Sequence, residues 1–182
     1  MTRFDSRGEL DTRALRHALS HFATGVCVVT ALGTDGNRLG MTVNSFSSVS
    51  LDPPLVLFNI ARSCRGFDGW ISAKCYGINV LSADQAEVSN RFARAQSDKW
   101  AGLKVETGHG GLPLLPDAIA RFVCEREGRH DGGDHVILLS RVVAFDFAAE
   151  ADPLCFFAGR FRKLGPEPDI STPAEPALFY GW

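Results

Sequence analysis

The feature that most limits how this chain can fold is a series of short apolar runs between residues 26 and 60, separated by turn residues. The runs are rich in β-branched residues, as strands are. They span Val26–Leu32, Leu39–Val43, Phe46–Leu51 and Leu55–Ile60. Thr34–Asn37 supplies turn chemistry between the first two, and Asp52-Pro53-Pro54 forces an extended corner before the last. Because such short connections join antiparallel strands, this part of the chain is predicted to be an antiparallel meander.

Helices are predicted at only a few places. Leu15, Ala18, Leu19 and Phe22 recur at helical spacing, which predicts an amphipathic helix over residues 11–22 that ends near Gly25. Further helical segments are expected within residues 62–72, from the cap residue Ser82 to about Ala95, and as one turn at 98–103.

The remaining apolar runs predict more strands. They are Cys75–Leu81, Ala118–Glu127, His135–Phe147 and Pro153–Leu164, with loops at 107–116 and 128–133. Strands and helices do not alternate, so the pattern favours a mainly β chain, a β-barrel with helical additions, over a doubly wound parallel sheet. The chain of 182 residues is predicted to be one domain, 11–164, between an N-terminal extension, 1–10, and a Pro-rich tail, 165–182.

Composition argues against several classes of protein. The chain has 19 Lys and Arg against 21 Asp and Glu, a net charge of −2, so nucleic-acid binding is not expected. No apolar run approaches the roughly 20 residues that span a bilayer, so no membrane association is expected. The five cysteines are widely spread, without a Cys-x-x-Cys pair. This argues against a disulfide framework and a metal site, and favours small buried hydrophobes in a cytoplasmic protein.

The densest polar cluster within apolar sequence is Gly40–Ser50. Alternation places Thr42 and Asn44 on one face of a strand, and Ser48 and Ser50 on one face of the next. Four short hydrogen-bonding side chains that converge on one wall could bind the edge of a heteroaromatic ring. The alternative is a solvent-exposed face of a barrel.

Two smaller clusters are candidates for ligand contacts. Arg62, Ser63 and Arg65 lie between a strand and a predicted helix, and they could hold a phosphate or could simply be solvated. His135 follows Gly133-Asp134 at the start of an apolar strand, where a histidine is often structural. His17 and His21, one helical turn apart, lack a third metal ligand.

In order along the chain, these segments resemble the short-chain flavin reductases, the flavin reductase-like domain family of FMN-binding split barrels. The resemblance covers residues 15–164. It rests on five stretches: Phe22–Val26, Gly40–Pro54, Asn79–Leu81, Gly133–His135, and Pro153-Leu154 ahead of Phe156–Gly159. It implies a split β-barrel, a homodimer, and reduction of FMN, FAD or riboflavin by NADH or NADPH. It also implies a partner monooxygenase or halogenase that receives the reduced flavin by diffusion.

The resemblance also implies roles for the polar cluster. Thr42, Asn44 and Ser45 would line the flavin ring and ribityl chain. The residues expected at its pyrimidine and N5 edge are Ser48, Val49 and Ser50. His135 would lie over the flavin face and touch the nicotinamide.

Other residues are implied on the phosphate side of the flavin and at the pyridine nucleotide. Residues 61–65 would hold the phosphate, through Ala61, Arg62, Ser63 and Arg65, with Ser63 and Arg65 in direct contact. Asn90, Phe92 and Ala93 would close over the ribityl–phosphate side, and Lys99 would add charge. Phe161 stands where the family often has tyrosine, so stacking on the pyridine nucleotide is expected there without a hydroxyl contact.

The expected reaction is hydride transfer from nicotinamide C4 to flavin N5, which needs stacked rings and no catalytic triad. The alternatives on the same barrel are a flavin carrier or sensor, a flavoprotein oxidase, and a structural module without ligand. The choices between FMN and FAD, and between NADH and NADPH, stay open at this point.

Overall fold

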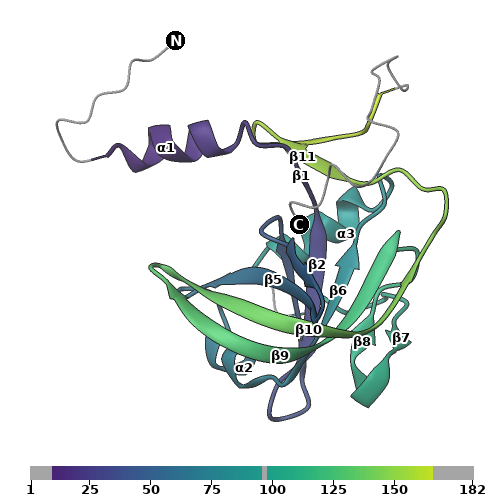
Figure 1. The fold of residues 1–182 in the computed structure, drawn as a ribbon. Helices are drawn as coiled ribbons and strands as arrows, with labels where there is room; N and C mark the ends of the chain where they lie inside the picture. The colour runs from purple at the N-terminus through teal and green to yellow at the C-terminus, as the bar shows by residue number, and fades with distance from the viewer. Residues whose placement is uncertain (1–9, 96–97, 166–182) are drawn as a thin grey trace.

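A computed structural model describes residues 10–95 and 98–165, and its main feature is one curved antiparallel sheet (Figure 1). The sheet has seven strands in the order β3-β2-β6-β9-β10-β5-β4. Their bounds are β2 Cys27–Leu32, β3 Arg38–Val43, β4 Ser47–Leu51, β5 Pro54–Ala61, β6 Cys75–Val80, β9 Ala120–Gly132 and β10 His135–Phe147. The edge strands β3 and β4 follow each other in the chain but stand at opposite ends of this order. The prediction of a mainly β split barrel with a few helices is confirmed.

The predicted strands between residues 26 and 60 are all present, but a single meander is wrong. β2 pairs with β3, and β4 pairs with β5. The segment Asn44–Phe46 carries the chain from one edge of the sheet to the other, and the inner neighbours of the two hairpins are the later strands β6 and β10. Turn residues determine the hairpins, because hairpins are local, but they do not determine which hairpins become neighbours.

The hairpin of β9 and β10 is longer than predicted. Residues 128–133 were expected as a loop because they are charged and rich in glycine, yet β9 continues to Gly132 and pairs with β10 up to His135. Most side chains of this end are exposed, so no apolar alternation identifies it as strand. Gly133, with φ of +74°, starts the turn that brings the chain to His135.

The first helix, α1 (Thr12–Leu19), is shorter than the predicted 11–22, and it extends away from the sheet (Figure 1). Asp11 caps it, since its Oδ1 accepts hydrogen bonds from the backbone N–H groups of Arg13 and Ala14 at 2.9 and 3.2 Å. None of its residues is buried, and Leu19 is 66% exposed. The apolar face of the helix therefore exists as predicted, but no core in the described chain covers it.

The other helices lie against the barrel. α2 (Phe67–Ser72) falls within the segment expected to be helical, and α3 is Ala86–Ala93. α3 begins later than predicted, because Ser82 forms a β-bridge with Pro153 and Gln85 is the N-cap. Residues 98–103 form turns rather than a helix. In the described part of the chain, no helix has the length and apolar character needed to cross a membrane.

Short strands complete the fold. The predicted strand 153–164 is instead a hairpin of β11 (Cys155–Phe157) and β12 (Arg160–Arg162), and β11 pairs with β1 (Thr24–Gly25). The predicted loop 107–116 holds a small ladder between β7 (Glu106–Thr107) and β8 (Pro113–Leu114), joined by the 3₁₀ turn η1 (His109–Gly111). Residues 1–9 and 166–182, which make up almost all of the predicted extension and tail, lie outside the described residues.

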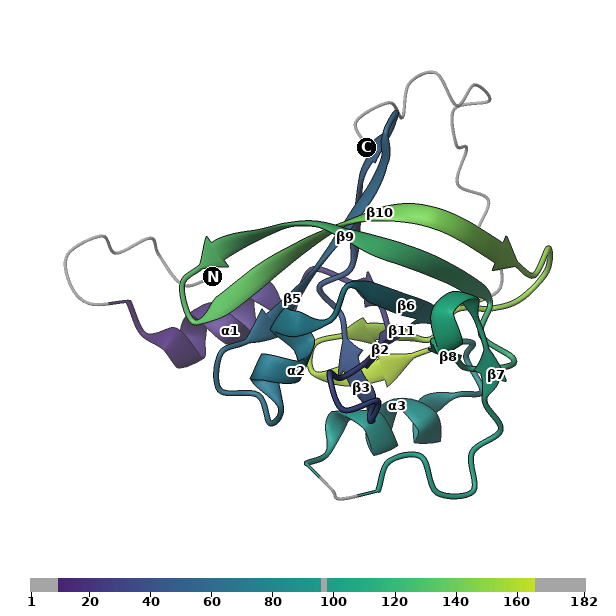
Figure 2. The ribbon, with the colours of Figure 1, turned by 90° about the horizontal axis from the view of Figure 1, so that it is seen from below.

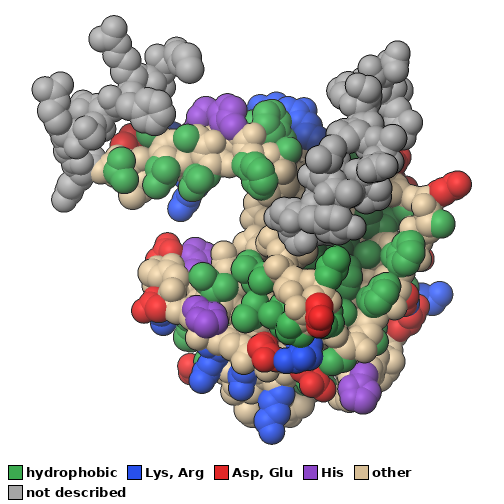
Figure 3. All heavy atoms as spheres, viewed as in Figure 1, with side chains coloured by type: hydrophobic (Ala, Val, Ile, Leu, Met, Phe, Trp, Pro, Cys, Tyr) green, Lys and Arg blue, Asp and Glu red, His purple; other side chains and the backbone are tan. Residues whose placement is uncertain are grey.

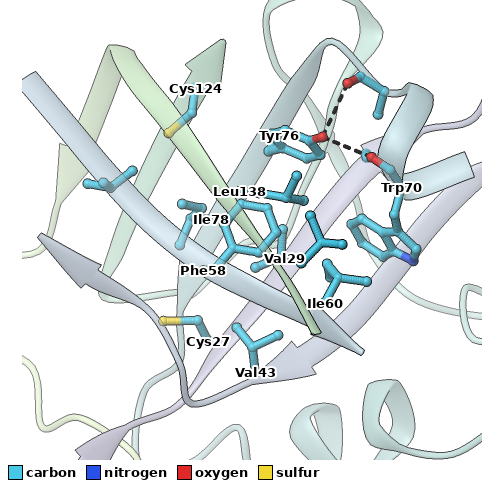
Figure 4. Packing of buried hydrophobic residues seen from close by; sticks show 14 residues of the cluster. Cys27, Val29, Val43, Phe58, Ile60, Trp70, Tyr76, Ile78, Cys124 and Leu138 are labelled. Carbon is cyan, nitrogen blue, oxygen red and sulfur yellow. Dashed lines mark hydrogen bonds between the residues drawn. The ribbon is translucent and has the colours of Figure 1, made fainter. Parts of the chain in front are cut away.

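The main core lies inside the curved sheet and is closed at one side by α2 (Figure 4). Phe58, Ile60 and Leu138 are fully buried, and the buried Tyr76 hydroxyl donates a hydrogen bond to the Trp70 carbonyl at 2.8 Å. All five cysteines are free. Burial raises the pKa of Cys27 and of Cys124 to about 12, so these two thiols are packing groups, as predicted. Cys64, Cys75 and Cys155 are only half-buried.

Candidate functional site

Two adjoining pockets lie on either side of the end of β3, and both are lined by residues 42–44. The first, the polar pocket, has a volume of about 330 Å³. Its polar lining comes from Thr42, Asn44, Ser45, Asn59 and His135. The second, the helix pocket, has about 300 Å³ and is closed by α3 and by the β11–β12 hairpin. Each has the size of a small-molecule site, and they share one wall.

Hydrogen bonds hold this shared wall in place. The Thr42 hydroxyl donates to the Ser89 carbonyl at 2.6 Å, which fixes α3 against β3. The Ser45 hydroxyl oxygen accepts from the Asn59 backbone N–H at 3.0 Å, which fixes the crossing segment against β5. Among the hydrogen bonds of the described residues, the Ser45 O–H and the lone pairs of the Thr42 hydroxyl oxygen remain unused. The wall therefore has both a donor and an acceptor for a ligand.

Asn59 is a site residue that the sequence analysis missed. Its side chain lines the polar pocket, and its Oδ1 is buried without a hydrogen-bond partner among the described residues. A buried polar atom without a partner is costly, so it indicates a ligand atom that would satisfy it. The signal available in the sequence was a single amide within the otherwise apolar strand β5.

The tip of the β9–β10 hairpin brings His135 to the mouth of the polar pocket. In the register of the sheet His135 lies opposite Ala61, the last residue of β5, and both line this pocket. Nδ1 of His135 lies 2.6 Å from Oδ1 of Asp134. Hydrogen bonding to His135 holds the pKa of Asp134 below its usual range, so this carboxylate is an acceptor and Nδ1 carries the hydrogen. Nε2 is then the ring nitrogen left for a ligand.

Arg62 is bound to the same hairpin tip. Its Nε donates to the Gly133 carbonyl at 2.8 Å, and one terminal nitrogen donates to Asp131 at 3.0 Å. Its backbone N–H donates to the Asp134 carbonyl at 2.9 Å. The Gly133 N–H and then Arg62 lower the pKa of Asp131. The structure thus uses the Arg62 guanidinium to hold the hairpin, whereas Ser63 and Arg65 are exposed beyond it.

The residues expected to close over the ribityl–phosphate side of the flavin lie on α3. Asn90 and Ala93 line the helix pocket, together with Phe161 of β12, which was expected at the pyridine nucleotide. Phe92 is fully buried beneath them, so its side chain supports this wall without facing a pocket. The Lys99 ammonium donates to the Phe92 carbonyl at 2.8 Å and to the Gly40 carbonyl at 3.2 Å.

Ser48, Val49 and Ser50 are not brought to the polar pocket. They lie on β4, at the opposite edge of the sheet, because the chain crosses over at residues 44–46. Ser48 and Ser50 line an apolar groove of about 590 Å³, together with Phe22, Phe46, Phe122 and Phe145, while Val49 is exposed. The expected single wall of four polar side chains is therefore divided between two sites within one chain.

Comparison with known families decides what kind of site this is. The model of the flavin reductase like domain matches residues 19–165. The chain belongs to this family. Among the described residues, this flavin reductase has no cluster of three or more His, Cys, Asp or Glu side chains that could hold a metal ion.

Curated relatives of this flavin reductase agree with that assignment. The chain is 45% identical over 157 residues to "FMN reductase (NADH) SmoA" of Agrobacterium fabrum, covering 86% of this chain and 88% of that protein. It is 48% identical over 136 residues to a Rhizobium meliloti protein whose name assigns it to the flavin reductases, covering 75% of this chain. The matched region spans only 44% of that second protein's length.

Solved structures of flavin reductases have the same fold. The NADH:FAD oxidoreductase SgcE6 of Streptomyces globisporus, in complex with NAD and FAD fragments, superimposes with a TM-score of 0.83 at 34% identity. The alignment covers 89% of this chain and 100% of that one. BorF, the flavin reductase component of a bacterial two-component tryptophan halogenase, has a TM-score of 0.79 at 34% identity, covering 86% and 100%.

The residues at the two pockets fit a flavin. An isoalloxazine edge offers both donors and acceptors, and Ser45 and Asn59 present groups of both kinds with bonding capacity left over. In the helix pocket the Ser89 hydroxyl is likewise buried without a partner among the described residues. Arg65 and Lys99 supply positive charge beyond the pockets, where a phosphate would lie.

Proposed function

We propose that this chain reduces a flavin with NADH at the two pockets beside β3 and releases the reduced flavin to an oxygenase. Membership of the family makes it an oxidoreductase of the flavin reductase type, with FMN or FAD and NADH as its reactants. The observation that carries the assignment is the buried, unpartnered Oδ1 of Asn59, a residue that lines the polar pocket together with His135.

The residues of this chain bind and orient the reactants. When bound, the flavin supplies the hydride-accepting N5, and NADH supplies the hydride from C4. Ser45, Asn59 and Asn44 hydrogen-bond the ring, and Thr42 holds α3 so that the wall does not move. Rigid donors at the ring edge stabilise the negative charge that develops there without reorganisation.

His135 has a different task, at the open side of the pocket. Asp134 fixes the tautomer of the His135 ring, and Arg62 fixes the backbone of the turn that precedes it. The position of Nε2 is therefore well defined. We assign His135 to contact with the nicotinamide. Hydride transfer requires the reacting atoms of the nicotinamide and the flavin to lie about 3–3.5 Å apart. His135 would therefore raise the rate of hydride transfer by orienting the nicotinamide.

The apolar groove and α1 favour a homodimer. α1 has eight residues, none buried, and helices this short are marginal unless tertiary contacts cover their apolar face. Figure 3 shows hydrophobic side chains along α1 and on the body below it. Leu15, Leu19, Phe22, Phe145 and Phe147 are all exposed. A second copy that covers this surface would also bring Ser48, Val49 and Ser50 into an interface, which could return them to the flavin site.

The partner is inferred from the names of relatives. One is the reductase subunit HsaB of a flavin-dependent monooxygenase in Rhodococcus jostii, 35% identical over 165 residues. Another is the reductase subunit Stc3 of a stachydrine N-demethylase in Rhizobium meliloti, 41% identical over 135 residues. We therefore propose a monooxygenase or halogenase that takes up the diffusing reduced flavin. Free cysteines throughout suit a reducing compartment such as the cytoplasm.

The experiment is a matrix of NADH and NADPH against FMN, FAD and riboflavin, followed by the loss of NAD(P)H absorbance and by flavin fluorescence. We expect NADH oxidation that depends on added flavin. Flavin binding without NADH oxidation would indicate a carrier or sensor, and turnover of a yellow protein without NADH would indicate an oxidase. Protein that quenches no flavin fluorescence would be a structural module, and each of these three results would overturn the proposal.

A further inference from the structure

A third pocket, the cationic pocket, opens beyond the other two and has a volume of about 510 Å³. Arg38, Arg65 and Lys99 line it, together with Trp100. None of the described residues that line it is acidic. Three positive side chains around one hollow, without a carboxylate, repel one another unless an anion lies between them.

The cationic pocket continues the flavin site along the chain. β3 runs between α2 and α3 (Figure 2), with Thr42 at the polar and helix pockets and Gly40 and Arg38 at the cationic pocket. Thr42 and Gly40 are two strand residues apart, a distance of about 7 Å. The segment that begins at the end of β5 connects the same two sites, because Ala61 lines the polar pocket and Arg65 lines the cationic pocket.

Lys99 is held in this pocket by neutral groups only. Its half-buried ammonium donates to two backbone carbonyls, those of Phe92 and Gly40, and no carboxylate of the described residues pairs with it. Burial lowers its pKa from the ordinary value for lysine. A ligand anion would compensate this charge better than carbonyl dipoles do.

Arg38 is positioned at the rim of the same pocket. The Trp100 indole N–H donates to the Arg38 carbonyl at 3.1 Å, and the Arg38 guanidinium carbon lies 6.0 Å from the centre of the Trp100 ring. Trp100 itself packs edge-on against the buried Phe92, with ring centroids 4.9 Å apart. Trp100 therefore holds the backbone of Arg38 and adds a weak cation–π attraction, which leaves the guanidinium donors available.

We propose that the cationic pocket binds the pyrophosphate of FAD, with Arg38 as the residue that distinguishes FAD from FMN. This inference rests on the proposed function, because the flavin ring must occupy the pockets beside β3. Arg65 and Lys99, nearer the flavin end, would meet the phosphate that FMN and FAD share. Arg38 would meet the second phosphate, which only FAD has. The volume of the pocket leaves space for the adenosine beside Trp100.

The test is Arg38→Gln in the full chain, with flavin affinity measured by fluorescence quenching in the absence of NADH. We expect the Kd of FAD to rise about tenfold, the effect of one lost charge-assisted hydrogen bond, and those of FMN and riboflavin to change less than about twofold. ADP should compete with FAD on the wild type and compete less well on the variant. Lys104→Gln removes a charge that is also exposed but lies outside the pocket, and it should leave all three affinities unchanged.

Three results would overturn the inference. An equal loss for FMN and FAD would assign Arg38 to the shared phosphate. A change only in the KM of NADPH, relative to NADH, would assign it to the 2′-phosphate of the nicotinamide dinucleotide. Unchanged FAD affinity in a variant with wild-type unfolding behaviour would leave Arg38 without a ligand. Because binding is measured without NADH, an FAD-specific loss in a protein that oxidises no NADH would support the pocket while rejecting the proposed reaction.

Discussion

The guanidinium of Arg62, just after the end of β5, donates a hydrogen bond at 3.0 Å to the carboxylate of Asp131 at the tip of the β9–β10 hairpin. The side chains are 44% and 80% exposed, so as an isolated ion pair this contact would contribute little to stability. Its importance is positional, because the second bond of Arg62, to the Gly133 carbonyl, fixes the turn that precedes His135. The pair therefore connects the segment expected to hold phosphate with the residue expected to meet the nicotinamide.

Arg62→Gln tests this positional role. We expect the KM of NADH to rise about fivefold, the effect of losing ~1 kcal/mol of hydrogen bonding, with flavin affinity unchanged. Steady-state kinetics and fluorescence quenching measure the two quantities separately. Arg141→Gln is the matched control, since Arg141 pairs with Glu127 on the same hairpin, away from the tip. Weaker FMN binding with riboflavin unaffected would instead assign Arg62 to the phosphate, as its sequence context suggested.

His135→Ala should slow flavin reduction while the flavin still binds. Loss of a rim contact that orients the nicotinamide is expected to reduce the rate of hydride transfer, or the affinity for NADH, about tenfold. Stopped-flow reduction at several NADH concentrations separates these two effects. His130→Ala, on the exposed arm of the same hairpin, is the control. Reduction with unchanged rate and unchanged NADH dependence would remove His135 from the mechanism.

Gly40→Ala should destabilise the fold near the helix and cationic pockets. A Cβ at this position would lie 2.6 Å from Cδ1 of Phe92 and 2.9 Å from Cζ2 of Trp100, which is too close for either ring. Overpacking of this kind costs about 1–3 kcal/mol of unfolding free energy. Urea denaturation measures it, and Gly165→Ala, where a Cβ would meet nothing within 4 Å, should have no comparable effect. Equal stabilities for the two variants would contradict the close packing of β3 against α3.

Asp146→Asn should lower stability at neutral pH and lose its effect in acid. Arg121 donates to both carboxylate oxygens of Asp146, at 2.9 and 2.6 Å, and these bonds lower the pKa of Asp146 from its ordinary 3.8. Because the pKa of Asp146 is lower in the folded chain than in the unfolded chain, its ionised carboxylate stabilises the fold fully above pH 3.8. This stabilisation is lost as the pH falls through the lowered pKa. Asp146 is 56% exposed, so we expect the variant to lose only about 0.5–1 kcal/mol of unfolding free energy at pH 7. Denaturation of both proteins at neutral pH and at successively lower pH measures the difference, and a constant difference would contradict the assignment.

The strands and the polar cluster Gly40–Ser50 can be predicted from the sequence because their signals are local. The apolar β-branched runs and the turn at residues 34–37 define β2, β3 and β5, and β10 has the predicted bounds. Gly133-Asp134-His135 likewise forms a tight turn into a strand. In each case a few adjacent residues specify the backbone geometry, through side-chain alternation or through a glycine that tolerates positive φ.

Only the tertiary structure decided which of these elements meet. Thr42 of β3 and Ser48 of β4 are six residues apart in sequence, yet their strands stand at opposite ends of the strand order and the two residues line different pockets. Arg62 and Asp131 are 69 residues apart and touch. Arg38, Arg65 and Lys99 surround one hollow although each comes from a different segment. Contacts of this kind depend on strand order and on packing between distant parts of the chain, and no local pattern of residues encodes either.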